Sequence, residues 1–219
     1  MIKEKLGHRI DGWIHTLFPF LFWRPISPDL MTVVGTLIAG SSGLAFAQGE
    51  FRAGGILLIA GGFFDLVDGV VARHFGVATR FGAFLDSSLD RVVDILAMLG
   101  LFAFFLKDLD LLGSIVCAWI LVATVLTSYA KARAELILER MPGGFLERGE
   151  RIGLLAIGGL TGWIWPVLGL LAFGSGVTVG QRFLYAYREM GRLDREAAAV
   201  QAGTPAKGLA AKPATVERD

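Results

Sequence analysis

The chain has 219 residues, of which 54% are hydrophobic and only 19% are charged. Its 21 Lys and Arg residues nearly balance its 20 Asp and Glu residues, so the net charge is +1. Soluble domains are usually about a quarter charged; this composition therefore excludes a disordered chain, argues against a soluble globular domain and offers no basic surface for nucleic acid. The sequence predicts an all-α polytopic membrane protein with no nucleic-acid partner.

The first predicted element covers residues 1–25, which begin with charged residues and continue with aromatic ones. The segment lacks the short apolar core and small-residue cleavage site of a secretory signal. We therefore expect an interfacial amphipathic helix that lies along the membrane surface.

Six transmembrane helices are predicted in residues 26–190, because each span needs about 20 mostly apolar residues. The predicted spans are 30–48, 53–73, 82–106, 111–131, 149–164 and 167–188. The connections are too short for a soluble domain, and the longest of them covers 135–150. Residues 191–219 are rich in Ala, Pro, Gly and charge, which predicts a disordered cytoplasmic tail.

Basic residues fall almost entirely on one side of this arrangement. Only Arg52 and Lys107 lie on the far side, and the other 19 of the 21 basic residues lie on the side of the two termini. The positive-inside rule therefore places both termini in the cytoplasm and the chain in the cytoplasmic (inner) membrane.

Four aspartates inside the second and third spans are the strongest functional signal. Asp65 and Asp68 are three residues apart and Asp86 and Asp90 are four apart, so each pair lies on one helix face. An ionised Asp near the centre of a span costs about 2.5 to 3.5 kcal/mol on insertion scales, so the four need a neutralising partner. Because they offer only oxygen ligands, we expect one or two Mg²⁺ or Mn²⁺ ions between the two helices.

A purely structural alternative would pair the four aspartates with arginines nearby in sequence, namely Arg73, Arg80 and Arg91. The four acids outnumber these basic groups, however, and the glycines beside them would have no explanation. Asp94 lies one turn deeper than Asp90, and the sequence leaves open whether it pairs with Arg91 or with a polar group on a neighbouring helix, or has a functional role.

The residues from Asp65 to Asp90 read D-x2-D-G-x2-A-R-x8-G-x3-D-x3-D, with eight fixed positions in 26. This motif resembles the signature of the CDP-alcohol phosphotransferases, integral membrane enzymes that transfer a phosphatidyl-type group from a CDP-linked lipid to an alcohol and release CMP. The resemblance implies that Asp65, Asp68, Asp86 and Asp90 bind the metal, and that Asp90 is also the general base.

The same resemblance implies a site for a CDP-diacylglycerol-type lipid or its ether-linked equivalent. The residues implied to form this site are Gly69, Ala72, Arg73 and Gly82. Thr32 resembles a weaker cytidine-side motif of the first span, although Ser27 and Pro28 before it could equally mark only the start of a helix. A homodimer is also implied, by the resemblance alone.

Basic residues at three predicted helix ends are expected to hold the acceptor, and they are Lys131, Arg133, Arg148, Arg151 and Arg182. Arg and Lys bind phosphate well, which favours a phosphorylated alcohol over a neutral one; an ordinary basic collar at the lipid headgroups is the alternative. The pattern resembles the phosphatidylinositol phosphate synthases, in which the residues matching Lys131, Arg151 and Arg182 hold the acceptor phosphate. Inositol 1-phosphate is therefore the expected acceptor.

Two other functions stay open at this point. The same chemistry with glycerol 3-phosphate as the acceptor would make the chain a phosphatidylglycerophosphate synthase. An ion-coupled membrane transporter would also carry acids inside its helices, but the far halves of the six predicted spans have no ionisable groups.

Overall fold

The computed structural model describes residues 27–201, which form helices and no strand. In chain order these are α2 (Pro28–Gly40), α3 (Ser42–Ala47), α4 (Phe51–Phe75), α5 (Arg80–Lys107), α6 (Leu111–Ala134), α7 (Arg148–Thr161) and α8 (Ile164–Gln201). The all-α expectation is confirmed over this range. The expected interfacial helix at 1–25 and positions 202–219 of the expected tail lie outside it.

Within residues 27–201, four helical segments are long and apolar enough to cross a membrane, and they are Pro28–Ala47, Phe51–Phe75, Leu111–Ala134 and Ile164–Gln201. Of the two other predicted spans, α5 has 28 residues but carries several charges, and α7 has only 14 residues. Large apolar side chains on the outside of the bundle are exposed, such as Leu37 (66%) and Leu44 (70%). Such exposure suits contact with lipid, and the chain is an integral membrane protein.

The short connection between α4 and α5 is fixed at both ends. Gly76 ends α4 in the left-handed conformation (φ +63°), which a glycine adopts without strain. Thr79 begins α5, where its side chain accepts a hydrogen bond from the Gly82 backbone N–H at 2.8 Å. The end of α4 and the start of α5, the two helices that carry the predicted metal ligands, are therefore both fixed.

Glycines allow the helices around the site to approach closely. A Cβ on Gly100 of α5 would lie 2.0 Å from the backbone oxygen of Gly43 on α3, and a Cβ on Gly61 of α4 would lie 2.4 Å from the Cβ of Ala39 on α2. Small residues at such contacts are typical of membrane helices, where tight van der Waals packing drives association.

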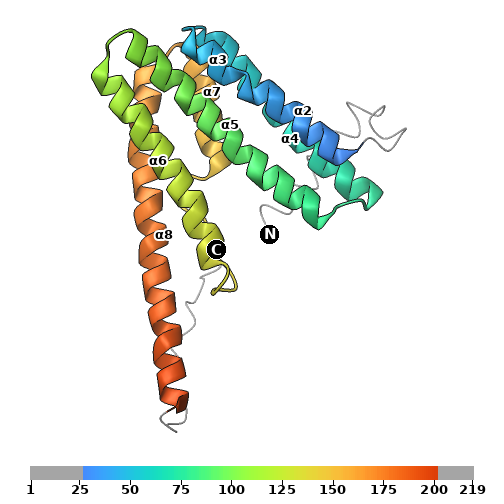
Figure 1. Ribbon diagram of the computed structural model, residues 1–219, viewed down its shortest axis with the longest axis vertical. Coiled ribbons are helices and arrows are strands. Elements are labelled where there is room, and N and C mark those ends of the chain that lie inside the picture. The colour runs from blue at the N-terminus through green and yellow to red at the C-terminus, as the bar shows by residue number, and fades with distance from the viewer. Residues whose placement is uncertain (1–26, 202–219) are drawn as a thin grey trace, which may run out of the picture.

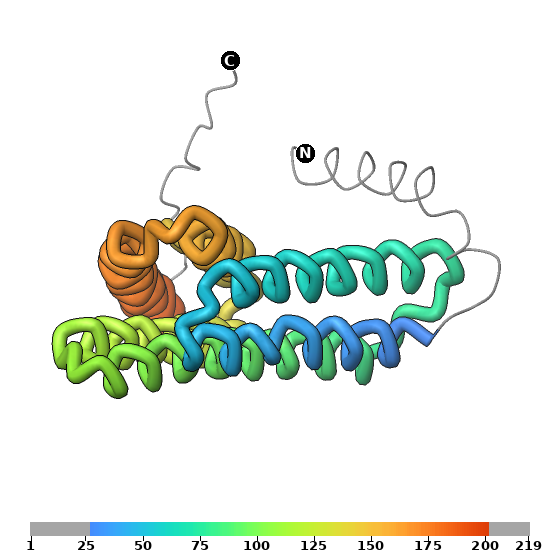
Figure 2. The backbone as a smooth tube through the Cα atoms, turned by 90° about the horizontal axis from the view of Figure 1, so that it is seen from above, coloured from blue at the N-terminus to red at the C-terminus, as the bar shows by residue number. Residues whose placement is uncertain are grey.

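Helix α2 packs closely against both α4 and α5, which make few contacts with each other (Figures 1 and 2). Helix α7 packs on α4. Helix α6 packs against both α5 and α8. Buried apolar side chains fill the half of the bundle away from the predicted acids. Among the largest are Phe46, Leu58, Leu101, Ile120, Leu155 and Leu168.

The turn between α7 and α8 lies earlier than the predicted spans imply. Helix α7 ends at Thr161, because Gly162 adopts a positive φ of +78°. Helix α8 begins at Ile164, so Pro166 falls in its first turn, where the backbone N–H has no intrahelical partner to lose.

Helix α8 also runs further than predicted, and it projects beyond the rest of the bundle (Figure 1). Residues 191–201 are helical, although the sequence composition suggested the start of a disordered tail. Two ion pairs between residues about one helical turn apart support this extension: Arg192 contacts Glu189 at 3.0 Å and Glu196 at 2.9 Å.

The close contact of α3 with α5 can be tested by enlarging Gly100. Gly100→Ala would place a methyl group 2.0 Å from the Gly43 oxygen, and overpacking of this kind costs about 1–3 kcal/mol. We expect a lower midpoint of thermal unfolding in detergent. Gly169→Ala adds the same group to α8 where no atom lies within 4 Å, and it should leave the midpoint unchanged or slightly higher. Equal midpoints for the two variants would contradict the close approach.

Candidate functional site

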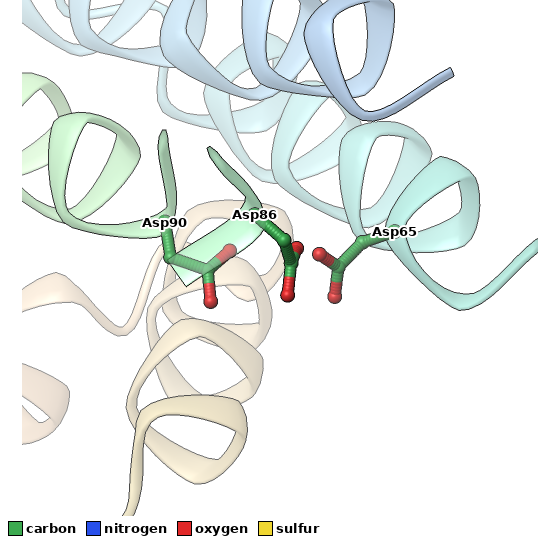
Figure 3. Close-up of side chains that lie close together, drawn as sticks. All are labelled: Asp65, Asp86 and Asp90. Carbon is green, nitrogen blue, oxygen red and sulfur yellow. The ribbon is translucent and has the colours of Figure 1, made fainter. Parts of the chain in front are cut away.

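Three of the four predicted metal ligands converge between α4 and α5. One carboxylate oxygen from each of Asp65, Asp86 and Asp90 lies within 4.8 Å of the others. Figure 3 shows the carboxylate of Asp65, from α4, turned toward those of Asp86 and Asp90, from α5. Asp86 and Asp90 arrive together because they are one helical turn apart. This cluster of oxygen ligands fits a hard divalent cation such as Mg²⁺ or Mn²⁺.

The fourth predicted ligand, Asp68, lies beside this cluster and is held by α2. Its side chain is only 6% exposed, and its Oδ2 accepts a hydrogen bond from the Thr32 hydroxyl at 2.5 Å. Thr32 is thus part of the site through its side chain and not only part of a helix start. Ser27 caps α2, accepting from the Leu30 N–H at 3.4 Å.

A cavity of about 200 Å³ adjoins the cluster on the side of Asp68 and Asp86. It brings together every residue that was expected to contact the CDP-lipid, namely Thr32, Gly69, Ala72, Arg73 and Gly82. A Cβ on Gly82 would lie 2.9 Å from Asp29 Oδ1 and 3.1 Å from Thr79 Oγ1. Glycine therefore keeps this part of the cavity open.

A second cavity of about 300 Å³ adjoins the cluster at Asp65 and Asp90. Thr32 lines both cavities, and Arg148 lies at the polar part of this one. The remaining wall is made mostly of small and apolar residues from α2, α4 and α7, including Gly35, Ala39, Leu58, Gly61, Gly153 and Ala156. The acids therefore lie between a cavity that has several charged side chains in its wall and a largely apolar one.

Arg148, the first residue of α7, is paired with three aspartates. Its Nη2 lies 2.8 Å from Asp90 Oδ1, its Nη1 lies 3.7 Å from Asp65 Oδ2, and its Nε lies 3.7 Å from Asp94 Oδ1. The sequence placed Arg148 only among the acceptor cations, because a contact between helices so distant in sequence leaves no local pattern. Arg91, one of the local partners considered for these acids, donates to the Ser87 backbone oxygen.

The partners of Asp94 are also on α7. Asp94 is 5% exposed, and its Oδ2 accepts a hydrogen bond from Arg151 Nη2 at 3.4 Å. Arg151 is also buried, and its Nη1 donates to the Leu146 backbone oxygen at 3.1 Å. Of the alternatives that the sequence left open for Asp94, the structure shows pairing with polar groups of a neighbouring helix.

The other predicted acceptor cations lie around the end of α6. Arg182 of α8 is 9% exposed and donates to the Thr127 backbone oxygen of α6. Lys131 is one turn further along α6, is exposed, and lies 3.9 Å from Glu135. Arg133 is exposed in the last turn of the same helix. The cations therefore share one end of the bundle, with Arg151 and Arg182 buried and Lys131 and Arg133 at the surface.

The loop between α6 and α7 is bound to α8, which the sequence did not predict. The Leu146 N–H donates to Thr178 Oγ1 at 2.9 Å, and the Phe145 N–H donates to Gln181 Oε1 at 2.7 Å. The next residues form a capping box, in which Glu147 and Glu150 satisfy each other's backbone N–H groups. This box begins α7 directly at Arg148, so α8 and the loop together position both arginines of α7.

Comparison with known proteins places the chain among lipid-modifying membrane enzymes. A family model described as CDP-alcohol phosphatidyltransferase matches residues 25–187. The phosphatidylinositol phosphate synthase of Mycobacterium tuberculosis is 36% identical over 186 residues, which cover 78% of this chain and 84% of that protein. The archaetidylinositol phosphate synthase of Methanothermobacter thermautotrophicus is 35% identical over 169 residues, covering 74% and 84%.

Two crystal structures of the M. tuberculosis synthase resemble the fold described above. The one with CDP-DAG bound has a TM-score of 0.67 and 31% identity, covering 84% of this chain and 94% of that one. The complex with manganese and citrate has a TM-score of 0.68 and 33% identity, covering 77% and 86%.

The acidic cluster predicts a specific loss of metal binding. Asp86→Asn removes one of the three converging carboxylates, and we expect the affinity for Mn²⁺ to fall at least about tenfold. Electron paramagnetic resonance of unbound Mn²⁺, titrated with protein in detergent, measures this. Asp108→Asn makes the same change at an exposed position at the opposite end of α5, and it should leave the affinity unchanged. Equal affinities for the two variants would contradict the assignment.

Proposed function

The chain belongs to the CDP-alcohol phosphatidyltransferase family, and we propose that it transfers the phosphatidyl group of CDP-diacylglycerol to inositol 1-phosphate, releasing CMP and forming phosphatidylinositol phosphate. One observation carries this proposal: Asp65, Asp86 and Asp90 converge beside a cavity lined by Gly69 and Arg73. The enzyme is a transferase of phospholipid synthesis that depends on Mg²⁺ or Mn²⁺, in keeping with its family and with the manganese-bound neighbour.

The proposed nucleotide site uses the cavity on the Asp68 side. Gly69, Ala72 and Gly82 leave room for the cytidine, and Arg73 contacts the diphosphate. Thr32 fixes the Asp68 carboxylate toward the metal centre through its 2.5 Å hydrogen bond. Asp65, Asp86 and Asp90, with Asp68 as a further ligand, would hold the dication, which would supply positive charge to neutralise the diphosphate and the departing CMP.

Asp90 is the proposed general base. It accepts the proton of the acceptor hydroxyl as that oxygen forms a bond to the lipid-side phosphorus. The bond between this phosphorus and the bridging oxygen of the diphosphate breaks, and CMP leaves with the electron pair. Arg148, 2.8 Å from Asp90 Oδ1, orients the carboxylate before the substrates arrive.

The two substrates are proposed to approach from different sides. The largely apolar cavity beside Asp65 and Asp90 suits the start of the lipid chains. The basic residues around the end of α6 suit the phosphate of the acceptor, and they are Lys131, Arg133, Arg151 and Arg182. Their combined positive charge favours a phosphorylated alcohol over a neutral one.

The membrane arrangement is also part of this proposal. We infer that α5 and α7 cross the membrane with the four apolar segments, because the acids of α5 face the metal centre and α7 packs on α4 and α8. The basic helix ends support an active site and both termini on the cytoplasmic side of the inner membrane. A homodimer, which the family resemblance implies, is also part of this proposal.

The transfer reaction can be tested directly. Purified protein with Mn²⁺, CDP-diacylglycerol and inositol 1-phosphate should release CMP, measured by chromatography. Asp90→Asn should lower the rate at least about 100-fold, since general base catalysis contributes roughly that much or more. Release of CMP only with glycerol 3-phosphate would move the assignment to phosphatidylglycerophosphate synthase, and no release with any alcohol would contradict the proposal.

The acceptor site predicts a selective effect at Lys131. Lys131→Ala should raise the KM for inositol 1-phosphate about tenfold, because a charge-assisted hydrogen bond to phosphate is lost. The KM for CDP-diacylglycerol should stay within about twofold, measured by the same assay. Lys107→Ala, at the far end of α5, is the control and should change neither constant. An equal rise in both constants for Lys131→Ala would contradict the placement of the acceptor.

A further inference from the structure

Arg148 and Asp94 form an incomplete contact beside the metal centre. Arg148 Nε and Asp94 Oδ1 are both buried without a hydrogen-bond partner, and they lie 3.7 Å apart. Buried polar side-chain atoms are usually hydrogen-bonded, and a normal bond of this type measures about 2.9 Å. The two atoms therefore face each other across a gap that a small side-chain movement would close.

The other end of the same guanidinium contacts a ligand of the metal. Arg148 Nη2 lies 2.8 Å from Asp90 Oδ1, and Nη1 lies 3.7 Å from Asp65 Oδ2. A dication among these carboxylates would lie close to the positive guanidinium, and the two cations would compete for the same oxygens. Arg148 can thus contact Asp90 most closely only when no ion is bound.

We propose that Arg148 is an internal counter-ion which the dication displaces from Asp90 onto Asp94. When the metal binds, the guanidinium leaves Asp90, and its Nε–H donates to Asp94 Oδ1. Asp94 is then a positioning residue that receives Arg148 and does not touch the metal. This inference rests on the metal centre of the proposed function.

The surroundings of Arg148 favour movement of the side chain over movement of the helix. The capping box of Glu147 and Glu150 fixes the start of α7, and Thr178 holds the preceding loop at Leu146. The Arg148 side chain is 29% exposed, so it has room to turn, whereas Asp94 is 5% exposed and already held by Arg151. Asp94 is therefore the fixed partner, and Arg148 is the one that moves.

The proposal predicts opposite effects on Mn²⁺ affinity at the two positions. With full-length protein in detergent, Arg148→Gln should raise the affinity about tenfold, because the competing cation is gone. Asp94→Asn should lower it about tenfold, because the displaced arginine has no carboxylate to receive it. In the Arg148→Gln background, Asp94→Asn should change the affinity less than twofold, which a double-mutant cycle measures.

Arg91→Gln is the matched control. Arg91 follows Asp90 in the sequence and carries the same charge as Arg148, but its side chain donates to the Ser87 backbone oxygen. It should change the affinity less than threefold. Arg148→Lys gives an independent measurement if Asp94→Asn does not fold. A lysine lacks the fork that bridges two carboxylates, so the affinity should lie between those of the wild type and Arg148→Gln.

Three results would overturn the proposal. The first is an equal loss of affinity from Asp94→Asn with and without Arg148, which would mean that Asp94 acts through its charge alone. The second is an unchanged affinity in both Arg148→Gln and Arg148→Lys. The third is a wild-type protein that does not bind Mn²⁺, which would also remove the metal centre from the proposed function and is thereby distinguished from the first two.

Discussion

The structure depends on holding three negative charges together in a bundle that is mostly apolar. Asp65, Asp86 and Asp90 approach within 4.8 Å, and their mutual repulsion must be offset by positive charge at the same place. Arg148 offers that charge from α7, and a dication offers it more strongly. Three features hold these charged side chains in position relative to one another. They are the close glycine contacts of α2 and α3, the Thr79 cap of α5 and the fixed start of α7.

Spacing within a single helix was enough to predict much of the site. Residues three or four positions apart share a face, so Asp86 and Asp90 were expected to act together. The expectation for Gly69, Ala72 and Arg73 came from the family resemblance, and these three residues line the cavity beside Asp68. The antiparallel course of α4 and α5 then brought Asp65 opposite Asp86, because the connection between the two helices is short.

Contacts between distant segments could not be predicted in the same way. The pairing of Arg148 with Asp90, and of Arg151 with Asp94, depends on where α7 packs, and α7 is placed by the loop bonds to Thr178 and Gln181. The helical extension to Gln201 was missed because composition outweighed the spacing of Glu189, Arg192 and Glu196. The earlier turn at Gly162 was missed because a neighbouring proline looked like the stronger break.

The division of the site among the helices has a consequence for how such enzymes diversify. The proposed metal ligands lie on α4 and α5, whereas the proposed acceptor residues Lys131 and Arg182 lie on α6 and α8. In the proposed function, one part of the chain therefore acts on the bond that is broken, and a separate part recognises the molecule that receives the transferred group. Substitutions on α6 and α8 would then change the acceptor without altering the residues that perform the reaction.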